Sequence, residues 1–484
     1  MALFTKADYR QGKHSQKGQN AMTLEDHLTA LPHDILVEPA TGGFAEEPRG
    51  RYTSANGIIA APKTTEGVAA IAHLAQTHGI SVIPYGGGTG LVGGQVAQTD
   101  TPHIVLSLHR MASLRHIDPD NATITVEAGM ILADVQATAD AHGLLFPLSL
   151  AAQGSARIGG NLATNAGGLN VLRYGNARDL CLGLEVVLAD GTIWHGLTGL
   201  RKDNTGYDLK HLIIGCEGTL GIITAATLRL FPKPRAYGTV LFAVPSPRAA
   251  VDVLALAKTQ FGQTISAFEI MHRQGLDFLA ETMPHIRLPF DPIPDWMVLM
   301  DIGDQNTDII RTGIENCFAT AFDADLAHDA ILAQSDAQRD ALWAVRENIP
   351  AANRLIGAVS SHDISMPISA IPDFIPQANA AIAALGPFRV NCFGHVGDGN
   401  LHYNIFPDPG KTRADYDALR PVIKRTVHDI VHQYGGSVSA EHGVGRLKVE
   451  DLERYGDPAK LAMMRAIKMA LDPTNILNPG VILR

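Results

Sequence analysis

The most informative segment for the fold of the first domain is Tyr85-Gly86-Gly87-Gly88-Thr89-Gly90-Leu91-Val92-Gly93-Gly94. It contains Gly88-x-Gly90-x-x-Gly93, the spacing of a dinucleotide-binding loop. A Rossmann unit needs a helix directly after such a loop and an acidic residue roughly 20 positions later. Here the polar residues 95–102 follow, then an apolar strand over residues 104–108. The sequence therefore predicts strand, glycine loop and strand, whose backbone N–H groups form an anion-binding concavity.

A second glycine-rich stretch covers residues 152–168. Two such stretches in one domain indicate a large cofactor lying close to the backbone, whereas structural turns that bind nothing are the alternative. Before the first loop, Thr64 or Thr65 can cap a helix that Gly79 ends, and an apolar strand over residues 81–84 follows. These elements place both glycine stretches in one domain of mixed helix and strand.

Near the C-terminal end, residues 394–404 and 439–445 supply three histidines and a glutamate in glycine-rich surroundings. Imidazole and carboxylate groups are ligands for divalent cations of intermediate softness. Most of the 20 histidines of the chain must be structural, but residues 401–406 alternate like a strand, which points His402 and Asn404 to one face. The adjacent Glu441 and His442 point to different neighbours, so one of them can be a metal ligand while the other stays free as a base.

Composition limits the classes of function. The 484 residues suffice for two or three domains, and the net charge of -10 is spread without a run of basic residues, so nucleic acid and anionic membranes are not expected partners. The four cysteines are too far apart for a metal ribbon, and no segment has the roughly 20 apolar residues of a membrane span. We expect a cytoplasmic protein, with the mitochondrial matrix as the alternative, and a leader before Met22.

The pattern of elements predicts four segments. Residues 1–47 form the leader and a helix, and residues 48–234 form the domain of short strands and glycine turns. Strand and helix units over residues 235–410 predict an α+β domain for the substrate, and residues 411–484 are expected to be mainly helical.

Five motifs, in order, give the chain a family likeness that covers nearly all of it after the leader. They are residues 84–94, 154–168 with 173–175, 217–224, 394–404, and 439–445 with 478–480. The sequence resembles FAD-linked oxidoreductases of the vanillyl-alcohol oxidase type, in the D-2-hydroxyacid dehydrogenase branch. The resemblance implies an α+β fold with an FAD-binding domain, an α+β cap domain and a C-terminal segment that returns to the flavin domain.

The resemblance also assigns the cofactor residues, with FAD that is dissociable rather than covalently attached. The residues that it places along FAD are Pro84, Gly86, Gly87, Gly88, Thr89, Gly90, Leu91, Gly94, Ser155, Gly159, Gly160, Thr164, Gly167, Gly175, Glu217, Gly221, Ile223 and Asn478.

By the same resemblance, the ligands of a divalent metal are His395, His402 and Glu441, with zinc expected and manganese or iron as alternatives. His442 is then the catalytic base, and the substrate-binding residues are Arg346 and Asn404. The implied reaction is oxidation of a small D-2-hydroxy acid to the 2-oxo acid, with hydride transfer to flavin N5. An electron-transfer flavoprotein, a quinone, a cytochrome or oxygen is expected to take the electrons, and a homodimer is one expected assembly.

Two departures from the family pattern bear on the substrate. Ser361 stands where relatives that oxidise D-2-hydroxyglutarate usually have lysine, so a cation for a second carboxylate is missing, although His362 could replace it in part. Val481 replaces the usual lysine after the terminal Asn-Pro-Gly. D-2-hydroxyglutarate is slightly favoured over D-lactate or a glycolate-oxidase-like activity. The other hypotheses are a metal-dependent hydrolase without flavin and a non-catalytic flavin-binding protein.

Overall fold

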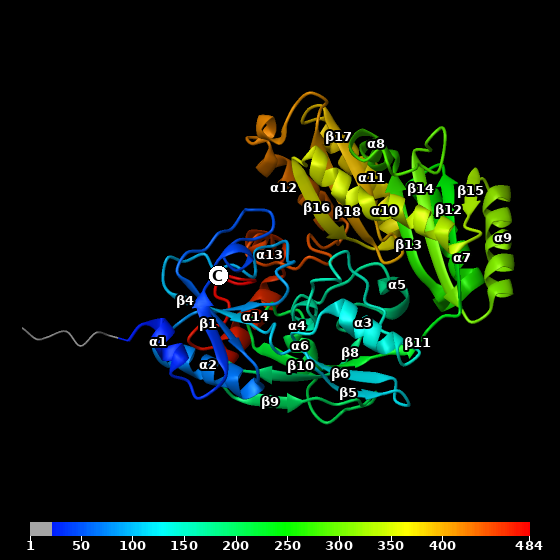
Figure 1. Ribbon diagram of the computed structural model, residues 1–484. Helices are drawn as coiled ribbons and strands as arrows, with labels where there is room; N and C mark the ends of the chain where they lie inside the picture. The colour runs from blue at the N-terminus through cyan, green and yellow to red at the C-terminus, as the bar shows by residue number, and fades with distance from the viewer. Residues whose placement is uncertain (1–21) are drawn as a thin grey trace, which may run out of the picture.

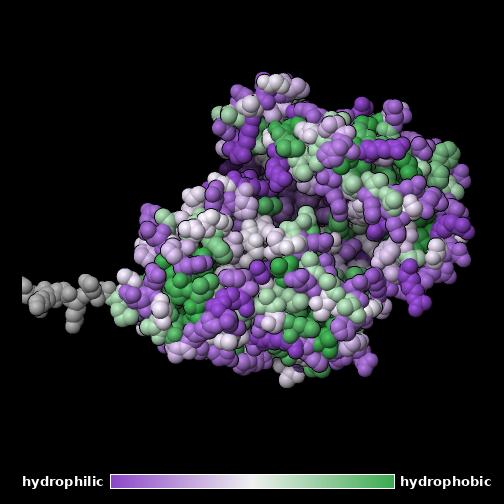
Figure 2. Space-filling model, in the orientation of Figure 1, coloured by the Kyte–Doolittle hydropathy of each residue, from purple (hydrophilic) through white to green (hydrophobic). Residues whose placement is uncertain are grey.

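Four sheets and the helices around them form two lobes in the computed structural model, which describes residues 22–484. The expected leader before Met22 lies outside the described residues. One lobe contains the four-, five- and two-stranded sheets, and the other is built on a seven-stranded sheet (Figure 1). The space-filling view shows the surface hollowed between the two lobes, with hydrophilic residues at the hollow (Figure 2).

The first sheet positions the glycine loop. Its strands, in spatial order, are β1 (Ile35–Pro39), β2 (Gly57–Pro62), β4 (His103–Ser107) and β3 (Val82–Tyr85). β3 and β4 are parallel neighbours, and residues 86–102 join them without a helix, as the sequence predicts. Helix α2 (Thr65–His78) begins with the Thr64 side chain accepting from the Gly67 N–H and ends at Gly79, whose φ is 65°. The predicted helix is therefore confirmed, including both ends.

The second sheet carries the other side of the same lobe and is antiparallel throughout. Its strands are β5 (Leu114–Asp118), β6 (Thr123–Glu127), β10 (Ile222–Arg229), β8 (Cys181–Val187) and β9 (Ile193–Gly196). Above it lie the short helices α4 (Ile158–Ala163), α5 (Val171–Tyr174) and α6 (Leu209–Ile213), while α3 (Leu132–Asp140) precedes β7 (Leu144–Leu145), which pairs with β11 (Phe231–Pro232). One hydrophobic core joins this sheet to the first.

The seven-stranded sheet of the second lobe is also antiparallel. Its strands, in spatial order, are β15 (Asp329–Leu332), β12 (Ala236–Val244), β14 (Trp296–Asp304), β13 (Ile265–His272), β17 (Phe388–Gly394), β18 (Asn400–Pro407) and β16 (Ser360–Ser365). Helices α7 (Pro247–Phe261), α9 (Thr307–Asp323), α11 (Ile371–Ala383) and α12 (Arg420–Gln433) cover one face. Helices α8 (Arg273–Thr282) and α10 (Asp336–Ile356) pack on the other face through a separate core.

The end of the chain returns to the first lobe. Helices α13 (Val449–Tyr455) and α14 (Pro458–Leu471) lie in that lobe (Figure 1), and Leu477 pairs with Val82 at the start of β3, the strand that precedes the glycine loop. The expected division at residues 234–235 falls between β11 and β12. The expected segment 411–484 differs from the structure, because α12 still packs on the seven-stranded sheet and the chain returns only after Gly435.

Membrane-spanning helices and disulfides were not expected from the sequence. Within residues 22–484, no helix has the length and apolarity needed to cross a membrane. All four cysteines are buried and free of disulfides.

Candidate active site

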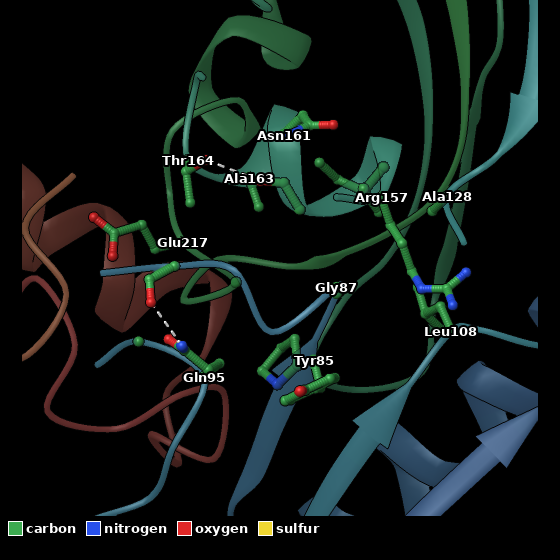
Figure 3. Close-up of a pocket in the computed structure, with 18 of the residues that line it drawn as sticks. Tyr85, Gly87, Gln95, Leu108, Ala128, Arg157, Asn161, Ala163, Thr164 and Glu217 are labelled. Atoms are coloured by element: carbon green, nitrogen blue, oxygen red, sulfur yellow. Dashed lines mark hydrogen bonds between the residues drawn. The ribbon is translucent and has the colours of Figure 1, made fainter. Parts of the chain in front are cut away.

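A long cavity in the first lobe lies between the two glycine stretches (Figure 3). β3 and the loop after it supply one wall, α4 supplies the opposite wall, and residues after α6 close one end. The lining residues are Pro84, Tyr85, Gly86, Gly87, Gly88, Thr89, Gly90, Val92, Gly94, Gln95, Leu108, Ala128, Arg157, Gly159, Gly160, Asn161, Ala163, Thr164, Glu217, Gly218, Gly221, Ile222, Ile223, His442 and Asn478. The cavity thus joins segments that are far apart in sequence.

The glycines allow the two walls to approach at backbone distance. A Cβ at Gly87 would lie 2.1 Å from the carbonyl oxygen of Ser155, well inside any van der Waals contact. A Cβ at Gly86 would meet the backbone of Gly160. Any side chain at Gly87 would therefore push the first loop away from the second stretch and change the cavity between them.

Most of the cofactor residues expected from the sequence line this cavity, and four lie outside it. Leu91 is not among the lining residues, and the carbonyl of Ser155 lies close to Gly87. Gly167 packs against the Glu441 side chain, and Gly175 packs against Asp179 at the end of α5.

Ten lining residues were not expected from the sequence. Seven of them flank expected residues and could have been found from that: Tyr85, Val92, Gln95, Asn161, Ala163, Gly218 and Ile222. Arg157 belongs to the second glycine stretch. Leu108 and Ala128 follow the ends of β4 and β6, where the local sequence carries no ligand-binding signal.

Glu217 connects the cavity to the C-terminal loop. Its carboxylate accepts the backbone N–H groups of Val444 (2.7 Å) and Gly445 (2.8 Å), and its carbonyl accepts the Asn478 side chain (2.9 Å). Burial raises the pKa of Glu217 to about 7 despite these donors. The loop that carries His442 is thereby fixed against the cavity wall.

Two asparagines in the lining retain a buried polar atom without a protein partner. The side-chain oxygens of Asn161 and Asn478 have no hydrogen bond in the structure. Buried polar atoms are normally satisfied. Together with the glycine walls, these atoms fit a polar ligand that lies along the cavity.

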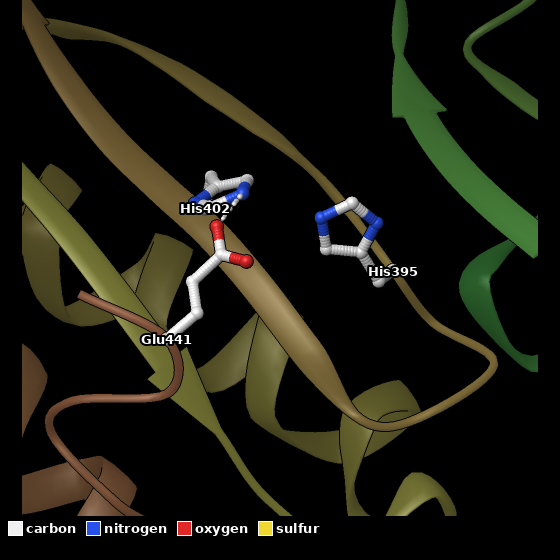
Figure 4. A group of neighbouring side chains, drawn as sticks. All are labelled: His395, His402 and Glu441. Atoms are coloured by element: carbon white, nitrogen blue, oxygen red, sulfur yellow. Dashed lines mark ion pairs between the residues drawn. The ribbon is translucent and has the colours of Figure 1, made fainter. Parts of the chain in front are cut away.

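The second group of interest is His395, His402 and Glu441, whose ligand atoms lie within 4.8 Å of one another (Figure 4). His395 follows β17, His402 lies in β18, and Glu441 comes from the loop after α12. The Nε2 atom of His402 is 3.6 Å from Glu441 Oε1. Burial lowers the pKa of His402 to about 3, so its imidazole is neutral. Two imidazoles and a carboxylate are a donor set that suits zinc or a similar cation.

The residues around this group form a row on one face of the seven-stranded sheet. His402 is opposite Asp363 in β16 and Phe393 in β17, while Asn404 is opposite Ser361. Side chains of directly paired strand residues share a face. The prediction that His402 and Asn404 face the same way is thus confirmed, and the same face carries α10 with Arg346.

His442 lies between the cavity and the metal-capable group. It lines the cavity, and its Nε2 is 3.7 Å from Glu441 Oε1. Its Nδ1 is 3.4 Å from Oδ2 of the buried Asp363, which also accepts the backbone N–H groups of Glu441 (3.1 Å) and His442 (2.9 Å). Asp363 was not among the site residues expected from the sequence, because it lies in a short, largely polar strand.

Arg346 is buried in α10 and is held by Glu269 of β13. Its Nε and Nη2 atoms lie 2.9 Å and 2.7 Å from Glu269 Oε2, and its guanidinium lies over the Phe393 ring. Glu269 also contacts His395 Nδ1 at 2.7 Å through its other oxygen. Burial raises the pKa of Glu269, but His395 and Arg346 outweigh this and lower it to about 2. Arg346 thus lies beside the metal-capable group, and Glu269 was missed.

The suggestion that His362 replaces the missing lysine is wrong. His362 alternates with Ser361 and Asp363, so it points to the opposite face, where its ring packs 5.1 Å from that of His428. It is buried and its Nε2 contacts Ser360. Ser361 itself is exposed beside Asn404, and no cation takes the place of the usual lysine on that strand. Val481 is buried near Gly94.

Two family models match the chain. One is described as FAD linked oxidases, C-terminal domain, and matches residues 233–482, and the other is described as FAD binding domain and matches residues 57–196. The D-2-hydroxyglutarate dehydrogenase of Xanthomonas citri pv. viticola is 37% identical over 464 residues, which are 95% of this chain and 96% of that protein. A probable mitochondrial D-2-hydroxyglutarate dehydrogenase of Oryza sativa subsp. japonica is 35% identical over 436 residues, 90% of this chain and 76% of that protein.

Solved structures share the fold at low identity. The p-cresol methylhydroxylase with substrate bound aligns with a TM-score of 0.69 at 17% identity, covering 87% of this chain and 88% of that chain. The alkyldihydroxyacetonephosphate synthase aligns with a TM-score of 0.66 at 19% identity, covering 89% and 77%.

The chain therefore belongs to the FAD-linked oxidases, in the D-2-hydroxyacid dehydrogenase branch. It is an FAD-dependent oxidoreductase, and the cavity between the glycine stretches fits the cofactor. This membership argues against a metal-dependent hydrolase in which the glycine stretches are only turns.

Replacing Gly87 by alanine is expected to weaken FAD binding by about 10–100-fold, since overpacking costs about 1–3 kcal/mol and the new Cβ overlaps the Ser155 carbonyl. The bound FAD per protein after gel filtration and the dissociation constant of the apoprotein measure it. Gly154→Ala is the matched control, because a Cβ at Gly154 meets nothing within 4 Å. Full FAD occupancy in Gly87→Ala would show that this approach of the walls is unimportant.

Proposed function

We propose that this enzyme oxidises a D-2-hydroxy acid to the 2-oxo acid, using FAD in the glycine-walled cavity and a divalent metal at His395, His402 and Glu441. The observation that carries the proposal is the position of His442, which lines the cavity and also lies beside Glu441. A base there can reach a substrate that contacts both the metal group and the flavin cavity.

Zinc is the proposed metal, with manganese or iron as alternatives. Two imidazoles and one carboxylate leave coordination positions for a ligand, as catalytic zinc sites require. The Nδ1 side of His395 is already engaged by Glu269, so Nε2 is the nitrogen that faces a cation.

A metal held by His395, His402 and Glu441 would supply a Lewis acid that makes the substrate hydroxyl more acidic, and FAD in the glycine-walled cavity would supply the hydride acceptor. The chain's own residues supply binding, orientation and the proton acceptor. His442 removes the hydroxyl proton, and Asp363 holds the imidazole through Nδ1. Arg346 keeps the Nη1 end of its guanidinium for the substrate carboxylate, since Glu269 occupies the Nε edge. The Asn404 oxygen accepts the His362 N–H (3.2 Å), which leaves the amide NH₂ for the substrate.

D-2-hydroxyglutarate is the favoured substrate, and D-lactate is the runner-up. The relatives named D-2-hydroxyglutarate dehydrogenase support the first, since one of them covers nearly the whole chain. Ser361 supports the second, because the exposed serine beside Asn404 offers no charge to a distal carboxylate. The electron acceptor is proposed to be an electron-transfer flavoprotein, a quinone or a cytochrome rather than NAD.

The purified FAD-loaded protein with zinc is expected to lose its flavin absorbance anaerobically when D-2-hydroxyglutarate is added, and more slowly with D-lactate. The measurement is stopped-flow absorbance over a panel of D- and L-2-hydroxy acids. The L-acids are the matched controls. If no member of the panel bleaches the metal-loaded protein, the proposed reaction is wrong, and faster bleaching by D-lactate would reverse the order of substrates.

A further inference from the structure

Glu269 has two partners that the proposed function assigns to different tasks. One carboxylate oxygen contacts His395 Nδ1 at 2.7 Å, and the other contacts Arg346 Nε and Nη2 at 2.9 Å and 2.7 Å. The side chain is fully buried, with 0% exposure. A buried carboxylate is costly unless such partners compensate it. Its position therefore depends on both contacts at once.

We propose that Glu269 is a positioning residue that sets the metal affinity through His395 and the substrate affinity through Arg346. This inference rests on the proposed function, since it requires a metal at His395 and a carboxylate at Arg346. Glu269 forms no contact with either of those groups itself. It deepens the assignment by tying two binding events to one side chain.

The first effect acts through the imidazole. A histidine that donates Nδ1–H to a carboxylate presents its Nε2 lone pair in a fixed direction and is a more basic ligand. His395 lies directly after β17 and its side chain is buried. Glu269, from the neighbouring strand β13, is the side chain that engages its Nδ1 and so fixes the direction of Nε2.

The second effect acts through the guanidinium. Glu269 holds the Nε edge, and the Phe393 ring lies 4.9 Å from the guanidinium carbon, so the edge formed by Nη1 and the second Nη2 hydrogen faces away from the glutamate. A guanidinium fixed in this way loses less freedom when it binds a carboxylate. Without the pair, Arg346 would be a buried cation with no partner.

Glutamine at this position cannot serve both partners. Its single oxygen can accept from His395 or from Arg346, and its NH₂ group then faces a donor on the other side. The Glu269→Gln variant must therefore disturb the imidazole or the guanidinium. We expect zinc to bind about 10–100-fold more weakly, as for other partners of metal-bound histidines, and the KM for D-2-hydroxyglutarate to rise.

The chain offers a matched control in the Asp301 and Arg339 pair. Asp301 lies on the same sheet, and Arg339 lies on α10 two turns before Arg346, with contacts of 3.1 Å and 2.8 Å. Neither residue contacts the metal-capable group. Asp301→Asn is expected to lower the melting temperature while zinc affinity, KM and FAD content stay at their wild-type values.

The experiment uses the full chain loaded with FAD. Zinc affinity is measured by competition with a chromophoric chelator, and KM, kcat, FAD content and melting temperature are measured beside it. Glu269→Asp is the second variant, because it keeps the charge but is one methylene too short to hold both partners. Its zinc affinity is expected to fall less, and its KM to rise less, than those of Glu269→Gln. If the Glu269→Gln variant fails to fold, the zinc affinity and KM of Glu269→Asp test the proposal instead.

The outcomes separate the two levels of the argument. Wild-type protein that binds no zinc would remove the proposed metal site and this inference with it. Wild-type protein that binds zinc, with Glu269 variants that keep zinc affinity and KM within about threefold and lose only thermal stability as Asp301→Asn does, would overturn this inference alone.

Discussion

Replacing His442 by alanine is expected to slow reduction of the flavin by D-2-hydroxyglutarate by about 10²–10⁴-fold, the usual contribution of a positioned base. The variant removes the imidazole that lies between the cavity and Glu441. Both glycine stretches of the cavity and all three proposed metal ligands stay unchanged. Anaerobic stopped-flow absorbance gives the rate of reduction, while FAD content and zinc affinity are measured on the same sample.

The His442 result also separates an enzyme from a passive flavin-binding protein. His432→Ala is the control, since His432 is an exposed histidine of α12 away from the cavity. Loss of bleaching with FAD and zinc still bound assigns the proton transfer to His442. A His442→Ala protein that bleaches at the wild-type rate would show that another group accepts the proton.

The parts of the site that lie within one local pattern could be predicted from the sequence. Alternation over residues 401–406 puts His402 and Asn404 on one face, and β18 has that alternation. The glycine loop between two strands is equally local, because a polar, turn-rich segment cannot form the Rossmann helix. The caps of α2 follow from Thr64 and Gly79 alone.

What the sequence alone does not reveal depends on contacts between distant segments. Glu269 and His395 are 126 residues apart, and Asp363 and His442 are 79 apart, so no spacing rule links them. Glu269 does carry a weak signal, since it is an acid inside an otherwise apolar and buried strand, whereas the strand of Asp363 is largely polar. The face of the sheet that His362 occupies could also have been predicted, because strict alternation along a strand puts His362 and its neighbour Ser361 on different faces.

The boundary of the C-terminal segment illustrates a different limit. The amphipathic pattern of α12 predicts a helix but not its partner, and either lobe could bury the apolar face. The structure puts Ile423, Val427 and Val431 of α12 into the core of the seven-stranded sheet. The loop with Glu441 and His442 then crosses to the cavity. This crossing brings the proposed metal ligands of the second lobe beside the FAD cavity of the first.

Removing the proposed metal ligand His402 is expected to reduce the rate of flavin reduction by about 10²–10⁴-fold, because metal catalysis contributes several kcal/mol. His402→Ala leaves only His395 and Glu441 of the three-residue group. The protein should stay yellow, since the FAD cavity lies in the other lobe. Chelation of the wild-type protein should give the same slow reduction, and zinc should restore it in the wild type but not in the variant.

His362→Ala is the matched control for this prediction, because His362 is also a buried histidine of the same sheet but faces away from the metal-capable group. It should lose thermal stability through the vacated space while keeping zinc affinity and the rate of reduction. If His402→Ala binds zinc as tightly as the wild type, the ligand set is wrong. If chelated wild-type protein is reduced at the full rate, the hydroxyl proton leaves without help from a metal, and His442 with Asp363 must account for the whole of the proton transfer.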